Sequence, residues 1–283
     1  MLQLKNKILF LLLGLILLNL LAWTAVFQSP SGFLEVNFFD VGQGDSIFIQ
    51  TPGRQQILID GGPNDSVLKK LNKEMPFWDR SIDLLILTHP ESDHISGLLE
   101  VLDHYEIKYV MWNGIDGNTA RYSKWKEALQ KEGCQQIIAK EGQELKLTGG
   151  TMEVVYPFRN LWNEHYKRSN DVSVVTRLNY GENEFLFAGD ISKKIEKQVS
   201  EKRVRADVLK VAHHGSKTSS SDELLKAVDP EVGIITVGEN DFGHPHFETL
   251  FSLEKYGIKV LRTDQDGDIK ILSDKNKFKI LTH

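Results

Sequence analysis

The sequence contains little cysteine and no excess of positive charge. Cys134 is the only cysteine among 283 residues, so no disulfide can form within the chain. Lys and Arg number 34 against 39 Asp and Glu, and the formal net charge is −5. Proteins that bind nucleic acid strongly and without sequence preference usually carry a basic surface. The composition therefore argues against strong non-specific binding of nucleic acid, although it does not exclude DNA as a substrate.

Breaks rich in Pro, Gly or Ser are missing from most of the chain. Only Ser29-Pro30-Ser31-Gly32 has the composition of a linker, and strand signals begin at Phe33. The remaining residues, in a chain that is 41% hydrophobic and 26% charged, are enough for one large core. We therefore predict one domain over residues 33–283, preceded by a separate segment over residues 1–32.

One long hydrophobic run is present, and it lies near the N-terminus. Lys5 and Lys7 precede residues 8–27, which are almost entirely apolar. A helix of this length rises about 30 Å, which is the thickness of a bilayer core. Residues 22–25 form only a poor small-x-small cleavage site. We therefore predict an uncleaved signal anchor with the catalytic domain outside the cytoplasm; the alternative is a cleaved signal peptide and secretion.

A weak internal repeat indicates the fold class. The first half runs from Ser46 through IFIQTPGRQQILIDGG and a helical stretch to the strand DLLILTH. The second half runs from Ser173 through VVTRLNYGENEFLFAGD and a helical stretch to DVLKVAHHGS. Hairpins combined with alternating strands and helices are typical of an α/β protein with mixed sheets. We predict two mixed sheets face to face with the helices outside, preceded by one N-terminal hydrophobic helix.

Side chains that bind metals gather where predicted strands end. Six of the nine histidines lie in the stretches THPESDH, AHHG and GHPH. Buried carboxylates and imidazoles are costly unless they are paired or bind a cation. The pattern therefore predicts two divalent metal ions and a metal-bound hydroxide as the nucleophile, with no need for Ser or Cys. The candidate metal ligands are His89, Glu91, Asp93, His94, Asp190, His213 and His214.

The order of the motifs resembles a known family. FFDVGQGDSIFI, LIDGG, THPESDHISG, FAGD, LKVAHHGS and GHPH are similar to the motifs of the metallo-β-lactamase-like domain of ComEC-type competence proteins. The resemblance extends from about residue 35 to 275 and implies the αβ/βα sandwich of the metallo-β-lactamase superfamily. It also implies that His89 and Glu91 bind one metal and that Asp93 and His94 bind the other. Asp190 would then bridge the two metals, and His213 or His214 would complete the second site. The internal repeat favours His213, because it corresponds to His89.

Two departures from the superfamily pattern concern the first metal. Glu91 stands where a histidine is usual, and the segment SNDVSVV has no histidine where another ligand is common. Carboxylate ligands shift the preference from Zn²⁺ toward Mn²⁺. We therefore expect two divalent ions, Zn or Mn, with the first held more weakly.

Other polar residues are expected near the metals. Asp93 and His244 are the candidate catalytic residues, and His244 could donate a proton to a leaving group or bind a phosphate. A structural turn with a solvated histidine is the alternative for His244. The candidate supporting or substrate-lining residues are Asp40, Asp45, Asp60, Asn170, Ser173 and Ser216.

These features predict a metal-dependent hydrolase, with a phosphodiester as the favoured substrate. Nuclease activity and a link to DNA uptake are what the resemblance implies, and polymers of the cell envelope are further candidate substrates. The N-terminal segment would contact the membrane, and the sequence identifies no protein partner. Two alternatives are a catalytically weak accessory or binding module of a DNA-uptake or envelope system, and an acyl hydrolase such as a β-lactamase or lactonase.

Overall fold

The computed structural model describes residues 2–28 and 32–282. Contacts divide the chain into two units, Met1–Gly32 and Phe33–His283. The first unit is helix α1 (Leu2–Gln28), in which Lys5–Trp23 is long and apolar enough to cross a membrane. Its role as a signal anchor stays a prediction, as does the hydrolase role of the second unit, and most of the predicted linker lies outside the described residues.

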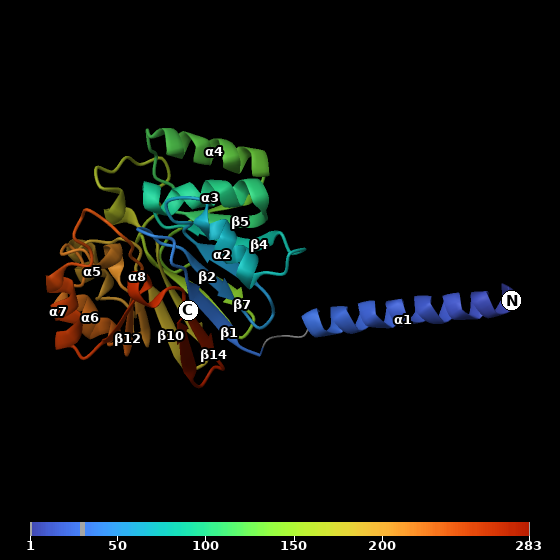
Figure 1. The fold of residues 1–283 in the computed structure, drawn as a ribbon. Coiled ribbons are helices and arrows are strands. Elements are labelled where there is room, and N and C mark those ends of the chain that lie inside the picture. The colour runs from blue at the N-terminus through green and yellow to red at the C-terminus, as the bar shows by residue number, and fades with distance from the viewer. Residues whose placement is uncertain (1, 29–31, 283) are drawn as a thin grey trace. The chain divides into compact units, whose positions relative to one another are not determined.

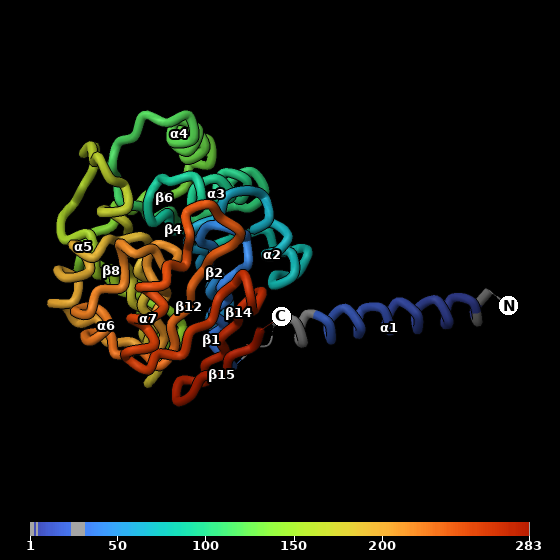
Figure 2. The backbone as a smooth tube through the Cα atoms, turned by 60° about the vertical axis from the view of Figure 1, so that its left-hand side comes forward, coloured from blue at the N-terminus to red at the C-terminus, as the bar shows by residue number. Residues whose placement is uncertain are grey.

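The second unit contains two mixed β-sheets, as the sequence predicts (Figure 1). The eight-stranded sheet has the order β15 (Phe278–Thr282), β14 (Ile269–Ser273), β1 (Leu34–Phe38), β2 (Ile47–Gln50), β3 (Gln56–Ile59), β4 (Ser81–Leu87), β5 (Glu106–Trp112) and β6 (Gln135–Ile138). The seven-stranded sheet has the order β13 (Lys259–Arg262), β12 (Val232–Ile235), β11 (Val208–Lys210), β10 (Asn183–Phe187), β9 (Val175–Tyr180), β8 (Gly150–Tyr156) and β7 (Glu144–Leu147). Strands β14 and β15, from the last part of the sequence, thus belong to the same sheet as β1, and β14 pairs antiparallel with β1 (Figure 2).

Helices cover the outer face of each sheet (Figure 1). Those against the first sheet are α2 (Ser66–Glu74), α3 (Ser92–His104) and α4 (Ala120–Glu132). Those against the second sheet are α5 (Lys193–Val199), α6 (Asp222–Val228) and α7 (Phe247–Lys255). The short helix α8 (Thr263–Asp266) connects β13 to β14, and the 3₁₀ helices η1 (Ser169–Val172) and η2 (Ala212–Gly215) lie in loops.

The central strands are mostly apolar because both of their faces are buried. In β3, Ile57 and Ile59 belong to the core between the sheets, whereas Leu58 belongs to the core under the helices. Strand β10 repeats the pattern in the other sheet, with Phe185 and Phe187 inside and Leu186 outside. Side chains alternate between the two faces of a sheet along a strand. A strand that is covered on both faces therefore has no solvent-facing row of polar side chains.

The two halves share one supersecondary unit. Strands β2 and β3 pair antiparallel, and β3 then pairs parallel with β4 after α2. Strands β9 and β10 pair antiparallel, and β10 pairs parallel with β11 after α5. The carboxyl ends of the parallel strands in both sheets lead into the loops that carry the candidate ligands.

Candidate dinuclear metal centre

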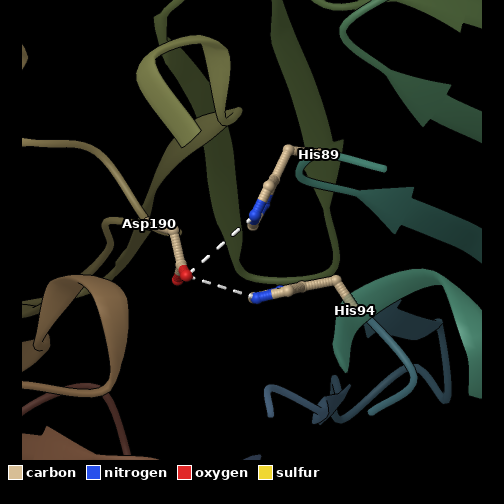
Figure 3. Close-up of side chains that lie close together, drawn as sticks. All are labelled: His89, His94 and Asp190. Carbon is tan, nitrogen blue, oxygen red and sulfur yellow. Dashed lines mark ion pairs between the residues drawn. The ribbon is translucent and has the colours of Figure 1, made fainter. Parts of the chain in front are cut away.

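Candidate ligands from both halves of the unit converge on the carboxylate of Asp190. Strand β4 leads to His89, the first turn of α3 carries His94, and β10 leads to Asp190. Figure 3 shows the two imidazoles pointing toward this carboxylate. Its Oδ2 atom lies 3.4 Å from Nε2 of His94, 3.5 Å from Nε2 of His214, and 4.0 Å from Nε2 of both His89 and His213.

The protonation state of His89 indicates that a cation belongs between its ring and the carboxylate of Asp190. Burial, together with the charge of His94, lowers the pKa of His89 to about 3, so its ring is neutral. Nδ1 of His89 lies 3.0 Å from Oγ1 of Thr88, which itself donates to Asp60, so Nδ1 is the donor and carries the proton. The lone pair on Nε2 then faces a buried carboxylate oxygen, an arrangement that is repulsive unless a cation lies between them.

Orphaned polar atoms support a cation at this point. Nε2 of His89, Nε2 of His94 and Oδ1 of Asp190 are buried and have no hydrogen-bond partner among the described residues. Buried polar atoms in folded proteins are almost always paired. Ligand atoms of His89, His94 and Asp190 lie within 4.8 Å of one another, and so do those of Asp93, His94 and His214. Imidazole and carboxylate donors suit Zn²⁺ and Mn²⁺, so these residues fit divalent metal ions.

The second group contains His214, whereas the internal repeat favours His213. Nε2 of His214 lies 3.1 Å from Oδ2 of Asp93, and Nδ1 of His214 donates to the carbonyl of Thr236 at 2.8 Å. His214 is buried, but the His213 side chain is 27% exposed and its Nε2 lies 3.4 Å from Nδ2 of Asn170. The hydrogen bond to Thr236 orients the His214 ring toward Asp93, as outer partners of metal-bound histidines commonly do.

Glu91 lies apart from both groups. It precedes α3 as its N-cap, and its carboxylate accepts a hydrogen bond from the hydroxyl of Ser169. Neither of the groups of ligand atoms described above includes Glu91. The expectation that Glu91 binds the first metal with His89 is therefore not met in this geometry, because Ser169 holds the carboxylate at the rim of the site.

Asp60 and Asp45 hold the histidines from behind. Asp60 accepts hydrogen bonds from the backbone of Thr88 at 2.8 Å and from Nδ1 of His94 at 2.8 Å. Asp45 accepts a hydrogen bond from the hydroxyl of Thr236 and lies 3.3 Å from Nδ1 of His214. Both carboxylates are buried, and the supporting role expected from the sequence stays a prediction, since their oxygens also lie within 4.8 Å of other possible ligand atoms.

The remaining supporting candidates differ in their distance from the centre. Ser173 is buried and accepts a hydrogen bond from the backbone of Asp190 at 3.2 Å. Asn170 lines the opening beside His213, and Ser216 accepts the backbone N–H of Thr218 just after the histidine pair. Asp40 is engaged elsewhere, since its carboxylate accepts from Gly42 and its own N–H donates to Asp268. Asp40 therefore shapes the turn that passes the site and does not reach the ligand atoms.

Lys210 is a functional candidate that the sequence analysis missed. It is fully buried, its ammonium forms an ion pair with Asp45, and it donates to the carbonyl of Gly189 at 3.1 Å. Its Nζ also lies 3.5 Å from Oδ1 of Asp190. Burial disfavours the charged lysine, but the carboxylates of Asp45 and Asp190 outweigh burial and raise its pKa. The available signal was a lysine inside the otherwise apolar strand DVLKVA.

Protons on two histidines balance the buried acids when no metal is bound. Burial disfavours the charged form of His214, but Asp190 and Asp45 outweigh it and raise its pKa to about 10. The pKa of His94 is also raised well above its usual value, against the effect of burial, by Asp190 and Asp60. Burial alone would raise the pKa of Asp93, yet His94 and His214 lower it to about 2. A metal ion at the centre would displace the histidine protons, so binding would release protons.

His244 lies at the mouth of the centre, in the loop after β12. Its ring centroid lies 5.5 Å from that of His213 and 6.4 Å from that of His214. Together with Asp93 and both of these histidines it lines a depression of about 350 Å³. Burial, then repulsion by His213 and His214, lowers the pKa of His244 to about 4, so the free ring is neutral.

Comparison with known proteins identifies the family. The family model described as metallo-beta-lactamase superfamily matches residues 39–160. The part of the chain over residues 39–160 belongs to the metallo-β-lactamase superfamily. The fold of this superfamily typically binds divalent metals, often two, in agreement with the site geometry. The predicted family resemblance and the predicted fold class are both confirmed.

Three relatives connect this member of the superfamily with competence proteins. It is 32% identical over 256 residues to ComE operon protein 3 of Bacillus subtilis, covering 83% of this chain and 32% of that protein. It is 28% identical over 242 residues to Recombination protein 2 of Haemophilus influenzae, covering 84% of this chain and 28% of that protein. It is 29% identical over 251 residues to competence protein ComA of Neisseria gonorrhoeae, covering 85% and 32%. The chain thus spans about a third of the length of these curated relatives.

Two solved structures share the superfamily fold. The metallo-β-lactamase fold protein YhfI of Bacillus subtilis aligns with a TM-score of 0.56 at 14% identity, covering 85% of this chain and all of that one. The metallo hydrolase Igni18 of Ignicoccus hospitalis aligns with a TM-score of 0.52 at 17% identity, covering 83% and 98%. At these identities the likeness concerns the fold alone.

Proposed function

We propose that this protein is a phosphodiesterase with nuclease activity that works outside the cytoplasm, anchored by α1 and linked to DNA uptake. The observation that carries the proposal is the convergence of four imidazole nitrogens on one carboxylate oxygen, with buried atoms left unpaired. Two cations held close together suit in-line displacement at phosphorus, because they stabilise both the attacking and the leaving oxygen. The names of the competence and recombination relatives support DNA as the substrate.

In this proposal His89 holds one metal ion, and Asp93 with His214 holds the other. His94 is common to both groups of ligand atoms, and Asp190, whose Oδ2 lies 3.4 Å from Nε2 of His94 and 3.5 Å from Nε2 of His214, would be a ligand available to both ions. When bound, the two ions polarise the phosphoryl group and lower the pKa of the attacking water.

The protein's own groups orient the ligands and the substrate. Asp60 fixes the ring of His94 and the carbonyl of Thr236 fixes that of His214, so each Nε2 faces the centre. Lys210 neutralises Asp45 behind the ligands and leaves Asp93 and Asp190 as the anionic donors. His244 at the mouth is positioned to hydrogen-bond an oxygen of the substrate or of the leaving group.

An activity assay with metal analysis tests the proposal. The full-length chain in detergent, supplied with Mn²⁺ or Zn²⁺, is expected to bind about two ions and to cleave single-stranded DNA and a model phosphodiester. Replacing the bridge, Asp190→Ala, should lower the rate about a thousandfold, because several kcal/mol of transition-state stabilisation depend on the metals. The matched control is His104→Ala, since His104 is an exposed histidine on the same helix as His94.

Each alternative function corresponds to a different result. Metal binding without cleavage of either phosphodiester would favour an accessory or binding module, consistent with the position of Glu91 outside the ligand groups. Hydrolysis of a β-lactam or lactone with intact phosphodiesters would favour an acyl hydrolase. Equal rates for Asp190→Ala and the parent chain would contradict the proposed metal chemistry itself.

A further inference from the structure

An exposed aromatic ring lies beside the metal centre and has no place in the mechanism above. Phe242 follows β12 in the sequence ENDFGHPH and is 73% exposed. It lines the same depression as Asp93, His214 and His244. At this position the ring can contact a ligand that has an aromatic or apolar face.

The side chain of Asn240 holds the loop that carries Phe242. The side-chain oxygen of Asn240 accepts hydrogen bonds from the backbone of Phe242 at 3.1 Å and of His244 at 3.0 Å. Its side-chain nitrogen donates to the carbonyls of Gly238 at 2.8 Å and of His244 at 2.9 Å. One partly buried amide thus ties both ends of the turn, so the backbone that carries Phe242 is held in place before a ligand binds.

The ring of Phe242 is already part of a stack. Its centroid lies 5.7 Å from that of His244, with 28° between the ring planes. Because one face is turned to His244, the exposed area lies mainly on the opposite face and the edge of the ring. A planar group placed there would extend the stack from His244 through Phe242 outward.

Three depressions around the centre share Glu91 as a lining residue. These depressions have volumes of about 410, 340 and 350 Å³. The third contains Phe242, whereas the first contains Arg121 and the second contains Arg168. Both arginines are exposed, so each of the two depressions beside the aromatic one offers a cation together with an aspartate, Asp116 in the first and Asp171 in the second. Stacking rings combined with cations that face a backbone are the elements by which proteins bind single-stranded nucleic acid.

We propose that Phe242 is a base-stacking residue that holds the nucleobase next to the scissile phosphate of a single-stranded nucleic acid. This inference rests on the proposed function. A base in a duplex is paired and stacked on its neighbours, so it offers no free face to the ring unless it is flipped out. Stacking also accepts any base, so the subsite would select for single strands and not for sequence.

Kinetics on paired substrates test the proposal. Variant Phe242→Ala in the full-length chain should raise the KM for a single-stranded 12-mer about tenfold with little change in kcat, the size expected for loss of one stacked base. Variant Phe242→Trp should restore the KM. An oligonucleotide with the same backbone and abasic sites in place of bases should give the same KM with Phe242→Ala as with the parent chain. The matched control is Phe77→Ala, since Phe77 is 76% exposed and lines none of the three depressions.

A binding readout separates this inference from the proposed catalysis. Tryptophan fluorescence of Phe242→Trp should fall on addition of the single-stranded 12-mer by more than in the parent chain, and the abasic oligonucleotide should not produce this difference. If no substrate is cleaved but the quenching appears, the catalytic proposal fails and the stacking site stands. An unchanged KM in Phe242→Ala, an equal loss on the abasic oligonucleotide, or absent quenching would overturn the stacking role. A change of oligomeric state in Phe242→Ala would instead assign the ring to a contact between two copies of the chain and would also overturn it.

Discussion

The two sides of the metal centre differ in how firmly the protein holds their ligands. On the side of His94 and His214, each imidazole donates through Nδ1 to a buried acceptor, Asp60 or the carbonyl of Thr236. On the other side His89 donates only to a neighbouring hydroxyl, and Glu91 is held by Ser169 at the rim. His89, His94 and His214 are all buried, so the two sides differ in the hydrogen-bond partners of their ligands and not in depth.

This difference indicates unequal metal sites. Outer hydrogen bonds fix the orientation of a ligand and raise its basicity, so the side with carboxylate and carbonyl partners should bind its ion more tightly. The ion beside His89 should exchange more readily. The sequence predicts a weaker first metal from the chemistry of Glu91, and the structure adds the direction of Glu91 as a second reason; the asymmetry itself stays a prediction.

The largest expected effect concerns the buried lysine behind the firmly held side. Variant Lys210→Met leaves the carboxylate of Asp45 buried and without its cation, and breaking one partner of a buried pair costs about 3–5 kcal/mol. The free energy of unfolding, measured by urea titration of the full-length chain in detergent with a metal chelator, should fall by this amount.

A double variant provides the control for Lys210. Lys210→Met combined with Asp45→Asn removes both charges and should recover much of the lost stability. If the single variant is as stable as the parent chain, the lysine does not serve as the counter-ion of Asp45.

The next comparison tests the two sides directly through their outer partners. Asp60→Ala removes the acceptor of His94 and should weaken metal binding about 10- to 100-fold, the usual effect of losing such a partner. Ser169→Ala, which frees Glu91 on the loosely held side, should change metal affinity much less. Competition titrations with a metal-sensitive dye measure both variants, and Asp60→Asn, which keeps an acceptor oxygen, should fall between them. Equal effects of Asp60→Ala and Ser169→Ala would remove the proposed asymmetry.

The fold and the positions of the ligand loops could be predicted because they depend on local patterns. The apolar strands before His89 and Asp190 and the repeat of hairpin, helix and strand define the sheets. Lys210 could not be assigned from its strand, because its partner Asp45 is 165 residues away in the sequence and only the tertiary structure brings them together.

The sequence left His213 and His214 open, and the structure sets their side chains apart for a backbone reason. The repeat places His213 where His89 stands, which would assign the same role if the two loops had the same conformation. Both His213 and His214 have positive φ angles, 54° and 51°, in the left-handed region. This turn redirects the side chains, so the buried ring that faces Asp93 belongs to His214. A sequence pattern carries no information on such a turn when neither residue is glycine.

The dependence of stability on pH should distinguish metal-free from metal-loaded protein. The folded pKa of His214 is about 10, above the unfolded value of about 6.5, so its protonation stabilises the fold fully below about pH 6.5. That contribution is lost as the pH rises from about 6.5 to about 10. Urea unfolding at several pH values should therefore give falling stability with a chelator and a flatter curve with Mn²⁺, which takes the place of the proton. Parallel curves would contradict the exchange of protons for metal at this histidine.

The smallest expected effect concerns the loosely held side. Glu91→His introduces an imidazole at the position where the superfamily usually has one, and a neutral ring nitrogen accepts from Ser169 more weakly than the carboxylate does. The ring is then free to turn toward His89, and a nitrogen ligand favours Zn²⁺ over Mn²⁺. The ratio of Zn²⁺ to Mn²⁺ affinity, measured by competition, should rise several-fold for the weaker site and stay unchanged for the tighter one. A matched change at the rim, Ser92→His, keeps the hydrogen bond from Ser169 to Glu91. It should leave the ratio of Zn²⁺ to Mn²⁺ affinity unchanged. A shift in the tighter site would mean that the two ions are not divided between the two sides as the hydrogen bonds indicate.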